Sequence, residues 1–157
     1  MLNNDVLRSL RFALNYSDST MLDIMQNVEP KLDLATLRSY LASEENESFI
    51  MLDDTLMVGF LDNLIVKLRG PSPQSKPTTD LPLNNNTILK KLRVAFSLHE
   101  TDLIDILYSV DFEISKPELS ALFRKAGHHN YRECGDQLMR QFLKGLTFYL
   151  RPDARLC

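Results

Sequence analysis

The side chains best suited to chemistry lie in one segment near the C-terminus, His128-His129-Asn130-Tyr131-Arg132-Glu133-Cys134-Gly135-Asp136. Imidazole, thiolate and carboxylate groups are the usual protein ligands of zinc. A zinc site needs four closely spaced ligands, however, and this segment offers two adjacent histidines and a single cysteine. We therefore predict no metal site and no cofactor.

Cys134 is the one candidate nucleophile. It precedes a predicted helix start at Asp136 by two residues, and a helix N-terminus can lower the pKa of a thiol. No general base can be assigned to it, so a buried structural cysteine is the favoured interpretation. Cys157 is a poor disulfide partner at the extreme C-terminus, which favours a reducing compartment.

Signatures of common enzyme classes are absent from the sequence. It contains no phosphate-binding glycine-rich loop, no His-Glu-x-x-His and no Gly-x-Ser-x-Gly, and it holds only five glycines. We expect a protein that is not an enzyme.

Basic side chains in the second half are the candidates for binding nucleic acid or another ligand. They are Lys90, Lys91, Arg93, Arg124, Lys125, Arg132 and Arg140. The segment from Asp102 to Lys125 has the outline of a helix-turn-helix, a common DNA-binding motif. Its turn is acidic and lacks glycine, and its second helix begins with Lys116, Pro117 and Glu118 rather than base-reading side chains. Nucleic-acid binding is therefore the alternative function.

These candidates belong to the second copy of an internal repeat. The segment 3–13 reads NNDVLRSLRFA and returns as NNTILKKLRVA at 85–95, an offset of 82 residues. The alignment continues without a gap to Leu68-Arg69 and Leu150-Arg151. The chain is one unit written twice.

Hydrophobic spacing predicts four helices in each copy. In the first copy they run from Asn3 or Asn4 to about Tyr16, from Ser17 or Asp18 to before Pro30, from about Leu34 to Ala42, and from Asp54 to Leu68. Ser115 and Glu118 form a capping box at the start of the third helix of the second copy. A loop or broken helix is expected at 44–52 and 126–134.

The fourth helix has the same six apolar residues in both copies. They are Leu56, Met57, Phe60, Leu61, Leu64 and Leu68, matched by Leu138, Met139, Phe142, Leu143, Leu146 and Leu150. Beside this core face the first copy adds Val58 and Ile65, where the second has Arg140 and Thr147. Val58 and Ile65 are therefore candidates for an interface with the other repeat or a second chain.

Polar identities between the two copies also need an explanation. They include Asn4 with Asn86, Arg11 with Arg93, Asp23 with Asp105, Asp54 with Asp136, and Arg69 with Arg151. One interpretation is helix caps and helix-end charges, with Arg11 or Arg93 paired to a carboxylate. The other is a duplicated ligand site built on the arginines.

Composition and charge define the domain organisation. Residues 3–69 hold six Lys and Arg against eleven Asp and Glu, a net charge of −5, and residues 85–151 hold ten against eight, a net charge of +2. We expect a first repeat at 1–69, a proline-rich linker at 70–84, a second repeat at 85–151 and a tail at 152–157. Repeats of this size are marginal alone, which favours packing against each other.

The duplicated motifs resemble a known family. Asn-Asn-x-x-Leu-x-x-Leu-Arg-x-Ala opens each half, and Tyr131-Arg132-x-Cys134-Gly135-Asp136-Gln137 is followed by Phe142-Leu143-x-Gly145-Leu146. Both are similar to the bacterial YehS-like proteins, domains of unknown function. The resemblance implies tandem helical repeats in a bacterial cytoplasmic protein and no established activity. Leu52 and Asn63 replace Cys134 and Gly145 in the first repeat, so any role of the Cys-Gly-Asp segment would lie in the second.

We therefore expect an all-α protein of two tandem homologous repeats, about four helices each, packed together. Its expected function is that of a non-enzymatic binding or protein-interaction module in the bacterial cytoplasm. A protein partner is expected, nucleic acid is the alternative partner, and no membrane is involved because no apolar run could span a bilayer.

Overall fold

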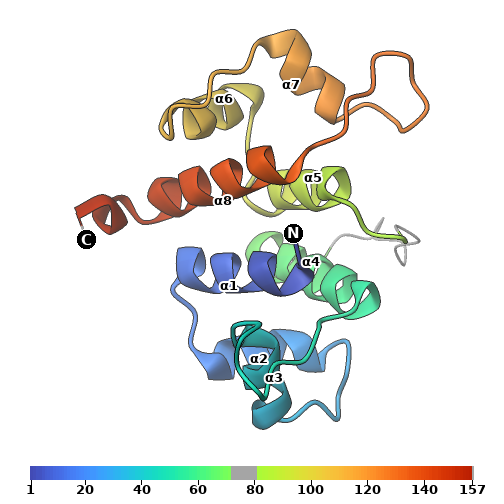
Figure 1. Cartoon of the computed structure of the whole chain (residues 1–157), viewed down its shortest axis with the longest axis vertical. Coiled ribbons are helices and arrows are strands. Elements are labelled where there is room, and N and C mark those ends of the chain that lie inside the picture. The colour runs from blue at the N-terminus through green and yellow to red at the C-terminus, as the bar shows by residue number, and fades with distance from the viewer. Residues whose placement is uncertain (72–80, 157) are drawn as a thin grey trace. The chain divides into compact units, whose positions relative to one another are not determined.

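The structure, a computed structural model, describes residues 1–71 and 81–156, without the side chains of residues 155 and 156. Its regular secondary structure within these ranges is entirely helical (Figure 1). Residue contacts divide the chain into two units, Met1–Leu83 and Asn84–Cys157. Most of the predicted linker, residues 72–80, lies outside the described residues, as does Cys157.

Each unit contains four α-helices in the same order, so the predicted all-α tandem repeat is confirmed. The first holds α1 (Asn3–Leu14), α2 (Asp18–Gln26), α3 (Leu34–Leu41) and α4 (Asp54–Arg69), and the second holds α5 (Asn85–Ala95), α6 (Glu100–Tyr108), α7 (Lys116–Leu122) and α8 (Asp136–Leu150). A short 3₁₀ helix, η1 (Pro152–Leu156), follows α8.

The helices pack in the same way within each unit. In the first repeat α2 lies against α3 and α4, and α1 also contacts both of them. In the second repeat α6 lies against α7 and α8, and α5 contacts α8. No described helix is long and apolar enough to cross a membrane.

Local capping follows the sequence at several helix starts. The Ser17 hydroxyl accepts a hydrogen bond from the Thr20 amide at the start of α2. Ser115 and Glu118 form the predicted capping box of α7. The prediction that Asp54 and Asp136 are N-caps was wrong, because Asp53 caps α4 and Gly135 occupies the N-cap position of α8.

Four of the six apolar residues predicted for the core face of α4 are buried, namely Met57, Phe60, Leu61 and Leu64. Leu68 was wrongly included, since it is 38% exposed in the last turn, where a helix end has neighbours on one side only. Val58 is buried and Ile65 is half-buried. The two repeats are described separately, so a contact between Val58, Ile65 and the other repeat stays a prediction.

Asn4 fixes the long connection between α3 and α4. Its side-chain nitrogen donates hydrogen bonds to the carbonyls of Tyr40 (2.9 Å) and Ile50 (2.8 Å), and its oxygen accepts one from the Leu52 amide (2.9 Å). Asn4 is fully buried, so these bonds satisfy polar groups that water cannot reach.

Asn3 extends the same network. Its side-chain nitrogen donates to the Leu52 carbonyl (3.1 Å) and to the Asp54 carboxylate (2.8 Å). We call the bonds made by this Asn-Asn pair the asparagine clamp, because they join the start of the first helix to the end of the third and the start of the fourth.

The second repeat makes the same clamp with every residue shifted by 82 positions. Asn86 bonds the Leu122 carbonyl, the Arg132 carbonyl and the Cys134 amide, at 3.0, 2.8 and 2.9 Å. Asn85 donates to the Cys134 carbonyl (3.0 Å) and the Asp136 carboxylate (2.8 Å). The clamp therefore holds both ends of the loop after α7.

The asparagines anchor loops instead of capping helices, so the role predicted for them from the sequence was wrong. Asn3, Asn4 and Asn86 were expected to cap helices, but the N-cap positions belong to Leu2 and Asn84. The shared Asp54 and Asp136 are likewise acceptors for the clamp. The polar identities at these positions are explained by loop anchoring in both repeats.

Replacing Asn4 with alanine should lower the free energy of unfolding by about 3 kcal/mol, because the buried amide of Leu52 and two carbonyls lose their partner. Urea denaturation followed by circular dichroism measures this. Asn27→Ala, which removes an exposed asparagine side chain from the end of α2, should change stability by less than about 0.5 kcal/mol. Equal losses in the two variants would contradict a special role for the clamp.

Candidate functional site

The clamped loop of the second repeat brings basic residues from separate elements together. Lys90 and Arg93 lie three residues apart on α5, which places them on one side of that helix. Arg124 and Lys125 follow α7 directly, and Arg132 lies on the loop, where its amide donates to the Ala121 carbonyl (3.1 Å). We call these five residues the basic face.

Three surface hollows share Arg124 as a lining residue. One of about 480 Å³ is lined by Arg93, Arg124 and Lys125 among others, one of about 170 Å³ by Lys90, Arg124 and Lys125 among others, and one of about 610 Å³ by Arg124 and Arg132 among others. Five of the seven basic residues predicted from sequence thus line hollows that meet the same arginine side chain.

The other two basic candidates lie elsewhere. Lys91 is only 9% exposed, unlike its exposed neighbour Lys90 on α5. Arg140 is exposed on α8 and lines none of the three hollows. Their sequence proximity to other cations did not indicate a shared surface.

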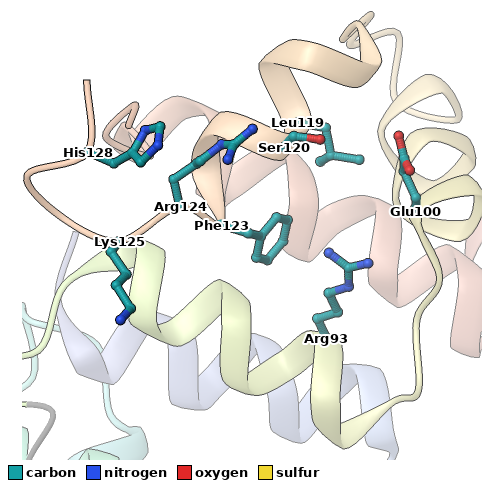
Figure 2. A pocket seen from close by; sticks show the side chains of 8 residues that line it. All are labelled: Arg93, Glu100, Leu119, Ser120, Phe123, Arg124, Lys125 and His128. Carbon is teal, nitrogen blue, oxygen red and sulfur yellow. The ribbon is translucent and has the colours of Figure 1, made fainter. Parts of the chain in front are cut away.

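Arg93 is held in a defined position where it lines the 480 Å³ hollow. Its Nε donates to the Leu98 carbonyl (3.2 Å), and its guanidinium carbon lies 4.7 Å from the centroid of the Phe123 ring. Figure 2 shows Arg93 rising from α5 towards this ring, with Glu100 on one side and Lys125 and His128 on the other. Its terminal guanidinium nitrogens make no hydrogen bond or ion pair within the described part of the chain.

Four residues of this hollow were not identified as binding candidates from sequence, namely Glu100, Leu119, Ser120 and Phe123. A position-by-position comparison of the repeats would have found the signal. Ser120 stands where the first repeat has Arg38, and Phe123 stands where it has Leu41.

Three arginine side chains of the first repeat form ion pairs with carboxylates of the same repeat. Arg8 pairs with Asp5, and Asp18 lies between Arg11 (3.1 Å) and Arg38 (3.2 Å). The predicted pairing of Arg11 with a carboxylate is therefore confirmed.

The matching positions in the second repeat have lost this arrangement. Thr87 replaces Asp5, and Ser120 replaces Arg38. Among the described residues, Lys90, Arg93, Arg124 and Lys125 have no carboxylate within 4.0 Å. Arg93, the equivalent of Arg11, makes no such pair among the described residues, although Glu100 lines the same hollow.

Within residues 1–71 and 81–156, Arg132 is the one member of the basic face that forms an ion pair. Its Nη1 lies 3.1 Å from the Glu118 carboxylate, and about half of each side chain is exposed. Hydrogen bonds from Ser115, aided by Arg132, lower the pKa of Glu118 below its usual range. An exposed pair of this kind contributes little to stability and can exchange for another anion.

In the segment from His128 to Asp136, Cys134 is a buried residue rather than a reactive one. Burial raises the pKa of this thiol to about 11, so it is protonated at neutral pH and is a poor nucleophile. The rings of His128 and His129 stack with centroids 4.5 Å apart. No group of three His, Cys, Asp or Glu side chains in the described part of the chain could hold a metal ion.

Comparison with known proteins agrees with the duplicated structure. The family described as "Protein of unknown function (DUF1456)" matches residues 3–70 and 85–151. The chain is also 38% identical over 149 residues to a protein titled "Uncharacterized protein YehS" from Escherichia coli (strain K12), covering 94% of this chain and 95% of that protein. No solved structure matches the chain.

A Cys157→Ser variant isolates Cys134 for a test of its environment. Because its pKa is raised from 9.0 to about 11, the thiol should react with an alkylating reagent at pH 8 at least about 10-fold more slowly in the native chain than in urea. Ionisation also favours the unfolded chain above pH 9, so stability should decline between pH 9 and 11. Equal native and unfolded rates would contradict burial.

Proposed function

The chain belongs to the DUF1456 family, whose function is unknown, and we propose that it is a non-enzymatic binding module that holds a nucleic-acid strand on the basic face of its second repeat. The proposal is based on the difference in ion pairing between basic residues at equivalent positions of the two repeats. Arg8 and Arg11 are ion-paired in the first repeat, whereas Lys90 and Arg93 at the same positions have no ion pair among the described residues.

Phosphate is the anion that this arrangement suits best. Lysine and arginine side chains supply most of the affinity of proteins for nucleic-acid backbones. Arg124 and Lys125 are exposed at the junction of the hollows, and Lys90 is exposed on α5 beside them. A strand can therefore follow a continuous path over these residues.

The geometry favours a single strand over a duplex. A helix of seven residues such as α7 is about 10 Å long, which is short for insertion into a major groove. Its first turn carries Pro117 and Glu118, and Glu118 is bonded to Ser115 and Arg132. Single-stranded nucleic acid instead uses cations along its backbone and aromatic rings beside its bases, as Arg124, Lys125 and Phe123 would provide.

The acidic first repeat is compatible with this function. Residues 3–69 carry a net charge of −5, which disfavours coating of nucleic acid by the whole protein. Binding would therefore be local to the second repeat. If the protein instead has the protein-interaction function predicted from sequence, the basic face would suit an acidic protein partner. The binding experiment below distinguishes an acidic protein from a nucleic-acid strand.

Fluorescence anisotropy with labelled single-stranded RNA and DNA 20-mers tests the proposal. If all five cations contact phosphates, the logarithm of the association constant should fall with the logarithm of salt concentration with a slope of about −3.5. Arg124→Glu with Lys125→Glu should weaken binding at least about 10-fold and reduce the slope by about 1.4.

Arg140→Glu with Lys144→Glu is the matched control, since it makes the same charge change at exposed positions of α8 outside the hollows. The control should bind within about 3-fold of the unmodified chain, a difference of less than 1 kcal/mol. Equal losses in both variants, or no binding at low salt, would reject the proposal. Displacement of the strand by a folded acidic protein but not by free nucleotides would favour the protein-interaction function.

A further inference from the structure

Several residues that line the 480 Å³ hollow differ from those at the equivalent positions of the first repeat, and one of the differences is the loss of the Arg38 guanidinium group. Asp18 of the first repeat is bridged by Arg38, which comes from α3, and by Arg11 from α1. Ser120 replaces Arg38 in the second repeat, and no side chain of α7 forms an ion pair with Glu100 among the described residues. Arg93 and Glu100 consequently border an open space instead of a closed ion-pair network.

The size and walls of this space define the ligand that it suits. Its volume lies within the range of about 300–1,000 Å³ that is typical of small-molecule sites. Lys125 and His128 lie at one side of the hollow and Glu100 at the other, with the Phe123 ring between them (Figure 2). A fitting ligand has an anionic end, an apolar ring and a hydrogen-bond donor at its far end.

A nucleotide has these three parts in this order. We infer that the hollow is a subsite for one nucleotide, with the phosphate near Arg124 and Lys125, the ring beside Phe123 and Arg93, and an exocyclic amino group donating to Glu100. This inference rests on the proposed function, and it identifies the hollow as the place where one nucleotide of the bound strand is recognised. Glu100 would accept from the exocyclic amino group of cytosine, adenine or guanine, a group that uracil lacks.

Isothermal titration of the full chain with 5′-CMP tests the subsite directly. The unmodified chain should bind 5′-CMP, and it should bind 5′-UMP and cytidine at least about 5-fold more weakly because each lacks one of the required groups. Equal binding of the three compounds would overturn the inference, as would the absence of 5′-CMP binding.

Ser120→Arg separates the subsite from general charge attraction. The new side chain should bridge to Glu100 as Arg38 bridges to Asp18, closing the hollow while adding a positive charge. It should weaken 5′-CMP binding at least about 10-fold. Ser19→Arg, which adds the same charge at an exposed position on α2 of the first repeat, should leave it unchanged.

The two proposals fail in different ways. If the unmodified chain binds strands but Ser120→Arg strengthens strand binding and leaves 5′-CMP binding intact, the subsite is wrong and the basic face stands. If neither strands nor 5′-CMP bind, both are wrong. Phe123→Leu introduces the residue of the first repeat and provides a second test if the Ser120→Arg variant does not fold. It should weaken 5′-CMP binding about 5-fold, because the aromatic ring beside the base is lost. An unchanged affinity for 5′-CMP would reject the subsite.

Discussion

The asparagine clamp is the interaction on which the arrangement of both repeats depends. Asn4 and Asn86 each satisfy one amide and two carbonyls of a connection that has no regular secondary structure of its own. A long loop between helices would otherwise leave backbone groups unpaired or open to water. Because the clamp recurs with identical register, it sets a constant frame on which surface residues can change independently.

The second repeat uses that frame for a different surface chemistry. In the first repeat Arg8 pairs with Asp5, and Arg11 and Arg38 pair with Asp18. Thr87 and Ser120 replace Asp5 and Arg38 in the second copy, whereas Arg93 and Glu100 keep the charges of Arg11 and Asp18. Loss of Asp5 and Arg38 at the equivalent positions frees Lys90 and opens the space around Arg93. The duplicated fold thus combines a copy in which Arg8, Arg11 and Arg38 are ion-paired with one in which Lys90, Arg124 and Lys125 are exposed.

Much of the fold could be predicted from the sequence, whereas the site could be predicted only in part. The spacing of apolar residues identified the four helices of one repeat, because that spacing depends on local sequence. The 82-residue offset then gave the same four helices in the other repeat. The role of Asn4 could not be predicted, since its partners Tyr40 and Ile50 are 36 and 46 residues away and a cap was the local alternative. For the same reason Lys91 and Arg140 looked equivalent to Lys90 and Arg124 until the helices placed them on different surfaces.

The central claim is that binding belongs to the second repeat alone. Amide chemical-shift mapping of the full-length chain, titrated with a single-stranded RNA oligomer, tests it most directly because it resolves each residue in both repeats. The account predicts that shifts concentrate at 87–93, at 119–132 and around Glu100, with the equivalent residues 5–11 and 37–50 unchanged. Shifts of equal size in both repeats, or shifts centred on the first, would contradict it.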